Sequence, residues 1–287
     1  MSFIFILQDT PSFFICLITF VGLMIGSFLN VVIYRLPEMM KRSWLQQCAE
    51  LRGETVEQQP TFNLITPRSA CIHCDHQITI LENIPILSYL ALRGRCSQCD
   101  TPISLRYPAV EVITACMSGF VAWHFGVSLI TIAALIFVWA LIALAVIDLN
   151  TQLLPDDITL PLLWVGLLIN MSSHGFTDSH SAIIGAAAGY LFLWLVYWGF
   201  KLITGKEGMG YGDFKLLSAI GAWLGWNMLP LIILFSSLVG AGVGIGLIIA
   251  AKLKKNIPIS FGPYLVGGAL IALFWGEKLN HAYFGLF

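Results

Sequence analysis

The chain has 287 residues, and apolar types make up 57% of it while charged types make up only 11%. A soluble domain of this length carries about 25% charged residues, so this composition excludes the soluble globular class. The formal net charge of −1 gives no bulk attraction for nucleic acid, and no nucleic-acid partner is expected. The composition predicts an all-α polytopic membrane protein whose first partner is the lipid bilayer.

Apolar runs long enough to cross a bilayer recur along the chain, and they predict about eight transmembrane helices. In chain order, these are Phe13–Ile33, Pro108–Phe125, Ser128–Ile147, Ile158–Met171, Ala182–Ile203, Phe214–Trp226, Leu229–Ala251 and Phe261–Trp275. No basic residue precedes the first run, which is therefore expected to be a retained helix rather than a cleavable signal peptide. The fourth and sixth runs are short, as is typical of helices that line a cavity inside the protein.

The lysines and arginines predict the orientation of these helices. If the N-terminus lies outside, the inner segments are 34–107, 148–157, 204–213 and 252–260. Lys278 is then the only one of the 15 basic residues on the outer side, as the positive-inside rule favours. The predicted domains are a first transmembrane helix (1–33), a cytoplasmic metal-binding insert (34–107) and a seven-helix transmembrane domain (108–287).

Four cysteines in the insert form two pairs with metal-ligand spacing, Cys71-Ile-His-Cys74 and Cys96-Ser-Gln-Cys99. Each pair presents two thiolates on one tight turn, and two such turns complete a four-sulfur zinc site. All four positions would be filled by protein, so the zinc would be structural. Unliganded thiols or a redox pair are the alternatives. A metal would also stabilise an insert too small to build a core of its own.

Two aspartates at the inner ends of predicted helices are the candidate catalytic residues. Asp148 ends the third apolar run and Asp213 opens the sixth, within the sequence GMGYGDFK. Two carboxyl groups that approach closely can share one proton, so that one activates water while the other polarises a peptide carbonyl. The glycines before Asp213 would leave backbone groups open to a substrate strand.

Structural roles for the same carboxylates stay open at this point. Asp213 stands where a helix N-cap would stand, Asp156 and Asp157 can cap the fourth helix, and Asp148 can be a solvated helix end. Glu111, just inside the second run, is expected to pair with Arg106 or Arg35. The sequence also allows a transporter that uses the aspartates as ion sites, or a non-enzymatic scaffold of a secretion machine.

Several blocks of the chain together resemble the type IV prepilin peptidases. These blocks are Gly26–Pro37 (GSFLNVVIYRLP), the two cysteine pairs enclosing Glu82–Ser88 (ENIPILS), Arg106–Glu111 (RYPAVE), Asp148–Asp156, Gly208–Lys215 (GMGYGDFK) and Phe261–Tyr264 (FGPY). They follow the family's order and cover nearly the whole chain.

The resemblance implies a bifunctional GxGD aspartic peptidase and N-methyltransferase of the bacterial inner membrane, with its active site facing the cytoplasm. Such an enzyme removes the basic leader of type IV prepilins and type II secretion pseudopilins, cutting between a glycine and, most often, a phenylalanine. It then methylates the new N-terminus with S-adenosylmethionine. The family's catalytic aspartates fall on Asp148 and Asp213, and its zinc-binding cysteines fall on Cys71, Cys74, Cys96 and Cys99.

The site of S-adenosylmethionine is less directly indicated by the sequence. The family places its methyltransferase determinants in the large cytoplasmic segment, where the sequence has no glycine-rich nucleotide loop of the Rossmann kind. Gly94, between Arg93 and Arg95, is the expected point of close approach to the cofactor. A turn before the second cysteine pair is the alternative role for Gly94.

Overall fold

The computed structural model describes residues 7–54, 61–173, 175–249 and 260–284, and within these ranges the ordered elements are helices. The chain forms two compact units, Met1–Thr131 and Ile132–Phe287, which are described separately below. The three expected domain ranges stay a prediction.

Each of the eight predicted apolar runs lies in a helix of the structure, apart from residues at run ends. The helices are α2 (Pro11–Leu51), α4 (Arg106–Phe125), α5 (Leu129–Thr151), α6 (Asp156–Asn170), α7 (Ser179–Thr204), α8 (Tyr211–Leu224), α9 (Leu229–Ile249) and α10 (Gly262–Phe284). Among the described residues, four helical segments are long and apolar enough to cross a membrane: Pro11–Leu51, Leu129–Thr151, Ser179–Thr204 and Trp226–Leu247. The end of the seventh run, Ala251, lies outside the described residues, as do Lys252, Lys254 and Lys255.

The first helix, α2, is longer than its apolar run because the polar residues that follow the run also have high helix propensity. It continues past Ile33 to Leu51 with Pro37 inside it. The residues after Pro37 are mostly strong helix formers, and Glu38 pairs with Arg42 one turn later at 3.1 Å. The loss of apolar character at Tyr34 therefore marks the end of the apolar stretch and not the end of the helix.

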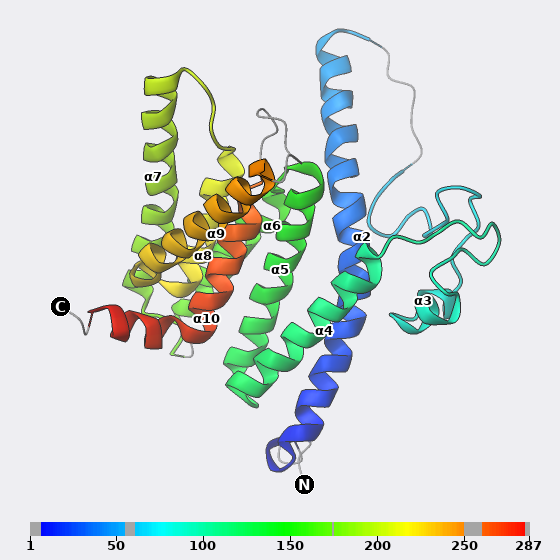
Figure 1. Ribbon diagram of the computed structural model, residues 1–287, viewed down its shortest axis with the longest axis horizontal. Helices are drawn as coiled ribbons and strands as arrows, with labels where there is room; N and C mark the ends of the chain where they lie inside the picture. Colours follow the sequence, from blue (N-terminus) through cyan, green and yellow to red (C-terminus); the bar gives the residue numbers. More distant parts are fainter. Residues whose placement is uncertain (1–6, 55–60, 174, 250–259, 285–287) are drawn as a thin grey trace. The chain divides into compact units, whose positions relative to one another are not determined.

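In the first unit, α2 and α4 form an antiparallel pair (Figure 1). The pairing runs from Thr19 beside Gly119 to Asn30, whose amide donates to the carbonyl oxygen of Tyr107 at 3.0 Å. Between these points Gly26 packs against the main chain of Glu111. Small residues at such positions let two helix backbones approach closely, which is how helices associate in an apolar solvent.

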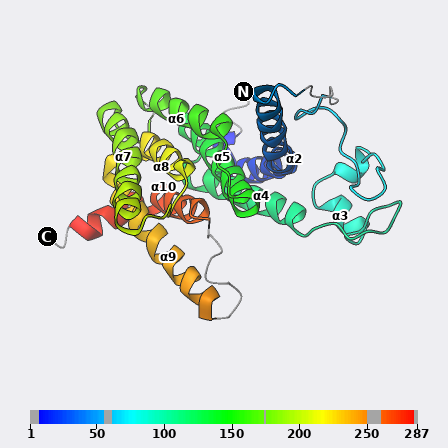
Figure 2. The ribbon, with the colours of Figure 1, turned by 90° about the horizontal axis from the view of Figure 1, so that it is seen from above.

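In the second unit, α8 is the central helix, and its residues from Asp213 to Leu224 are buried except for Lys215. Helices α6, α7 and α10 pack around α8 (Figures 1 and 2), and Phe137 of α5 stacks on Trp223 of α8 with ring centroids 4.7 Å apart. A helix that is apolar on every side belongs in the middle of a bundle. The sixth run is thus short because it is a core helix, and Asp213 stands at its N-terminal end.

The C-terminal end of α8 is held by a buried asparagine, Asn170, the last residue of α6. Its side-chain amide donates to the carbonyl oxygens of Ala222 and Trp223 at 2.8 and 2.9 Å. Its side-chain oxygen accepts from the backbone N–H groups of Phe176 and Thr177 at 2.7 and 3.2 Å. One side chain therefore satisfies backbone groups at the end of α8 and in the loop that follows α6.

Replacing Asn170 with alanine is expected to lower the stability of the second unit by about 2–4 kcal/mol, because buried backbone groups lose their partners. The measurement is thermal unfolding of the detergent-purified protein. Asn150→Ala is the matched control, since Asn150 is exposed and donates to the carbonyl of Val146 in its own helix. Equal melting temperatures for the two variants would contradict this role of Asn170.

Candidate active site and metal centre

Asp148 lies in the last turn of α5 and is buried, with 4% of its surface exposed. The alternative of a solvated helix end is therefore wrong. Its carboxylate oxygen Oδ2 accepts the backbone N–H of Gly262 at 3.0 Å, and its carbonyl oxygen accepts the hydroxyl of Ser260 at 2.9 Å. The segment that begins α10 thus binds both the side chain and the main chain of Asp148.

Asp213 is also buried, with 7% of its surface exposed, and it lies in the first turn of α8. The N-cap of this helix is Gly210, so the alternative role of Asp213 as N-cap is wrong. The charge of Asp148 acts on Asp213, so the structure brings the two predicted catalytic carboxylates into one electrostatic environment. Two buried carboxylates that interact in this way can share a proton, which is the property that the predicted mechanism needs.

Leu154 fills the space between the segments that carry the two aspartates. A Cβ atom on Gly212 would stand 2.8 Å from Cβ of Leu154, and a Cβ atom on Gly262 would stand 3.5 Å from its Cδ1. Gly212 precedes Asp213, and Gly262 binds Asp148. The connection between α5 and α6 is therefore packed against both halves of the candidate site.

An ion pair beside this connection links the starts of α6 and α8. Nζ of Lys215, two residues after Asp213, lies 2.8 and 2.7 Å from the two carboxylate oxygens of Asp156. Asp156 and Asp157 lie in the first turn of α6, whose N-cap is Pro155 with no side-chain cap hydrogen bond. The predicted capping role of these two aspartates is wrong, and the contact of Asp156 is this pair.

An aromatic cluster also anchors the start of α8. The rings of Tyr197, Tyr211 and Phe214 have centroids 5.3–5.7 Å apart. Lys201 donates to the hydroxyl of Tyr197 at 3.1 Å and to Glu207 at 2.8 Å. The loop that leads into GMGYGD is thereby joined to α7, which restrains the helix end carrying Asp213.

The four predicted metal ligands lie together in the first unit. The sulfur atoms of Cys71, Cys74, Cys96 and Cys99 all lie within 4.8 Å of one another. The sulfurs of Cys71 and Cys99 are 3.7 Å apart, and those of Cys74 and Cys96 are 3.9 Å apart. A tetrahedral zinc with Zn–S bonds of about 2.3 Å needs sulfurs about 3.8 Å apart. The donor set fits zinc, and it leaves no position for substrate.

The two cysteine turns share one hydrogen-bond pattern. In the first, the N–H of Cys71 donates to the carbonyl of His76, and that of Asp75 donates to Cys71. In the second, the N–H of Cys96 donates to Thr101, and that of Asp100 donates to Cys96. Asp75 and Asp100 both have a positive φ, 55° and 56°. The repeated sequence C-x-x-C-D was the signal for this internal repeat, which the sequence analysis missed.

Hydrogen bonds within the cluster favour thiolates at two of the ligands. The hydroxyl and backbone of Thr101 lower the pKa of Cys99 to about 6, and the backbone N–H groups of His73 and Cys74 lower the pKa of Cys71. Thiolates are the form that binds a metal ion. The surroundings of Cys71 and Cys99 thus favour the ligating form, whereas burial and the neighbouring thiols raise the pKa of Cys74 to about 12.

A glutamate between the turns joins them. Glu82 accepts hydrogen bonds from the hydroxyl of Ser97, beside the second turn, and from the backbone and hydroxyl of Thr79 at 2.8 Å. Its carboxylate also lies 3.3 Å from Nε2 of His76. These donors, Ser97 first, lower the pKa of Glu82 to about 2. The ENIPILS block therefore contributes a carboxylate that holds the insert together.

Gly94 lies in a left-handed turn with φ of +70°, immediately before the second cysteine turn. Its N–H donates to the carbonyl of Tyr89, and its own carbonyl accepts from Ile103. A Cβ atom on Gly94 would stand 2.7 Å from the hydroxyl oxygen of Tyr89. The close neighbour of Gly94 is thus Tyr89, and a role in binding S-adenosylmethionine stays a prediction.

The expected ion pairs of Glu111 are wrong. Glu111 accepts the backbone N–H of Ile86 at 2.8 Å, which ties α4 to the insert. Arg35 is buried and donates to the carbonyls of Asn63 and Pro67 at 2.9 and 2.6 Å. A planar guanidinium suits two converging carbonyls, so the charges of Arg35 and Glu111 serve two separate contacts with the insert.

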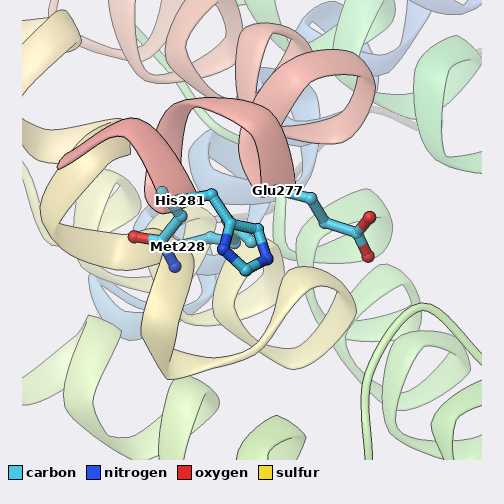
Figure 3. A pocket seen from close by; sticks show the side chains of 4 residues that line it. Met228, Glu277 and His281 are labelled. Carbon is cyan, nitrogen blue, oxygen red and sulfur yellow. The ribbon is translucent and has the colours of Figure 1, made fainter. Parts of the chain in front are cut away.

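A pocket of about 380 Å³ lies at the other end of α8, lined by Met228, Glu277, Asn280 and His281 (Figure 3). Because α8 has 14 residues, its length of about 21 Å separates this pocket from Asp213. Figure 3 shows the carboxylate of Glu277 directed away from the imidazole of His281. The pocket therefore gathers no catalytic pair and is distinct from the site at Asp148.

Comparison with known families gives two matches along the chain. Residues 20–125 match the family model described as the bacterial peptidase A24 N-terminal domain, and residues 135–245 match the type IV leader peptidase family. The two matches fall on the segment that holds the cysteines and the segment that holds both aspartates. No solved structure matches the chain.

Similar curated proteins cover nearly the whole chain, and each is described as a prepilin leader peptidase/N-methyltransferase. The protein of Aeromonas hydrophila is 54% identical over 275 residues, covering 95% of this chain and 94% of its own length. That of Stutzerimonas stutzeri is 52% identical over 279 residues, and that of Pseudomonas aeruginosa is 50% identical over 278. Each of these two alignments covers 96% of both chains.

Proposed function

This chain belongs to the type IV leader peptidase family, and we propose that it cleaves the leader from type IV prepilins and pseudopilins and then N-methylates the new N-terminus. The observation that carries the peptidase activity is the pair of buried aspartates, Asp148 on α5 and Asp213 on α8, in one electrostatic environment. The same two activities stand in the descriptions of relatives at about half identity.

The dyad acts by general acid–base catalysis with no covalent intermediate. The ionised aspartate takes a proton from a water molecule, whose oxygen attacks the scissile carbonyl carbon. The protonated aspartate donates to the carbonyl oxygen as it gains negative charge. When the tetrahedral intermediate collapses, the carbon–nitrogen bond breaks and the leaving amine takes a proton from the dyad. Burial excludes bulk water and strengthens each of these electrostatic interactions.

Cys71, Cys74, Cys96 and Cys99 hold one structural zinc ion. Four protein ligands leave no open coordination position, so the ion orders the insert and takes no part in peptide cleavage. The separation of the sulfur atoms supports this assignment. S-adenosylmethionine supplies the methyl group, and the segment 34–107 with Gly94 is the proposed region of its binding.

In the membrane, all eight helices are proposed to span the bacterial inner membrane, with the N-terminus outside and both aspartates at the cytoplasmic edge. The distribution of lysine and arginine supports this orientation. The apolar segment of the precursor enters laterally among the helices of the 108–287 domain, while its basic leader stays in the cytoplasm near the acidic inner loops.

The test uses detergent-purified protein and a synthetic pilin peptide that carries its leader. The expected products, read by mass spectrometry, are the leader ending in glycine and a mature peptide beginning with phenylalanine. With S-adenosylmethionine present, the mature peptide gains the mass of one methylene group. A peptide with the glycine before the cut replaced by a bulky residue is the control and is expected to stay intact.

Two other functions predict different results in this assay. A transporter or a non-enzymatic scaffold would leave the leader peptide intact although the protein is folded and monodisperse. Cleavage without any methylation would remove only the second half of the proposal.

A further inference from the structure

The FGPY block near the end of the chain and Ser260 just before it have no role in the mechanism above, yet Ser260 and Gly262 bind a catalytic candidate. The hydroxyl of Ser260 and the N–H of Gly262 both donate to Asp148, more than a hundred residues earlier in the chain. One contact fixes the main chain at the end of α5, and the other fixes carboxylate oxygen Oδ2. Two donors on one short segment therefore define both the position and the rotation of this side chain.

The space at position 262 admits no side chain. A Cβ atom there would stand 2.6 Å from Oδ2 of Asp148 and 3.3 Å from its carboxylate carbon. The first distance is below any ordinary non-bonded contact, and Gly262 is itself buried. Alanine at this position would force the carboxylate away from its present place, while the backbone N–H would still point at the vacated position.

We propose that Ser260 and Gly262 are positioning residues for Asp148 in peptide cleavage. Ser260 holds the main-chain carbonyl of Asp148, and Gly262 holds Oδ2 in a hydrogen bond, so that the other carboxylate oxygen handles the reacting water. An N–H donor stabilises the ionised form of a carboxylate, so this contact also keeps Asp148 able to accept a proton. The inference rests on the proposed peptidase function and adds α10 as the third element of the catalytic site.

The test compares Ser260→Ala, Ser260→Thr and Gly262→Ala with Gly267→Ala in the peptide assay. Gly267 is the matched control, since it lies on the same helix, is exposed and has nothing within 4 Å of a Cβ atom. Ser260→Ala is expected to lower kcat about 5- to 10-fold, the effect of one hydrogen bond, with KM unchanged. Gly262→Ala is expected to lower kcat about 100-fold or more, because small displacements of catalytic groups have effects of that size.

A pH profile separates positioning from general structural damage. In Gly262→Ala the acidic limb of kcat/KM is expected to move to higher pH, because the ionised carboxylate loses its N–H donor. Ser260→Ala removes a bond to the main-chain carbonyl and is expected to keep the wild-type limb. Ser260→Thr keeps the hydroxyl and is expected to keep the wild-type kcat, and Gly267→Ala is expected to match wild type throughout.

Wild-type kcat in Ser260→Ala would overturn the inference, even if Gly262→Ala fails to fold. An equal loss in Gly267→Ala would also overturn it, since the effect would then be general to α10. If the wild-type protein itself cleaves no peptide, the proposed function fails first, and that result is distinct from either of these.

Discussion

Replacing Asp148 or Asp213 with alanine is expected to abolish leader cleavage, with a loss of at least about 10³-fold in kcat for either variant alone. The two carboxyl groups act as one unit, so removing one loses most of what removing both would lose. The double variant is therefore expected to be no slower than the slower single variant. The measurement is the rate of mature-peptide formation by mass spectrometry.

Asp157→Ala is the matched control for the dyad variants. Asp157 is an exposed carboxylate in the first turn of α6, beside the same connection, and is expected to leave cleavage unchanged. All variants should still methylate a peptide that already lacks its leader, because that activity is proposed for the 34–107 insert. Cleavage that survives in either single variant would mean that the dyad is misassigned.

Removing the metal is expected to unfold the insert without abolishing the chemistry of the dyad. Zinc binding to a comparable four-ligand site supplies about 10–16 kcal/mol of apparent binding free energy, which becomes folding free energy where no core exists. Cys96→Ser, or treatment with a strong chelator, should therefore lose zinc, expose the insert to proteolysis and abolish methylation. Zinc content by elemental analysis and limited proteolysis are the measurements.

Cys48→Ser is the control for the metal prediction. Cys48 is exposed on α2 in the same unit and lies outside the four-sulfur cluster. This variant should keep about one zinc per chain and resist proteolysis like wild type. A zinc-free protein that still keeps a protease-resistant insert and methylates normally would contradict the structural role of the ion.

The sequence predicted the helices well because apolar runs are local signals. It placed the end of the first helix near Ile33 because polarity changes there, whereas helix propensity continues to Leu51. Local signals also found the cysteine pairs, and the fixed spacing within each pair carried enough geometry to predict the cluster.

The contacts of single side chains were beyond the sequence because their partners lie far away along the chain. Nothing near Asp148 indicates that Ser260 and Gly262 will bind it. The opposite charges of Glu111 and Arg35 suggested an ion pair, but each side chain forms hydrogen bonds with backbone groups of the insert instead. These side-chain contacts depend on where a segment without regular secondary structure passes a helix, and a periodic sequence pattern does not predict that position.

The length of α2 sets the height at which the insert meets the membrane. A helix of 41 residues is about 60 Å long, roughly twice the hydrocarbon thickness of a bilayer. If Phe13–Ile33 fills the bilayer, the stretch from Arg35 to Leu51 extends about 24 Å beyond it. The carbonyl oxygen of Asn63 accepts a hydrogen bond from Arg35, so at Asn63 the chain lies beside the start of that stretch. On this placement, the chain enters the first cysteine turn from near the lipid headgroups rather than from the far end of α2.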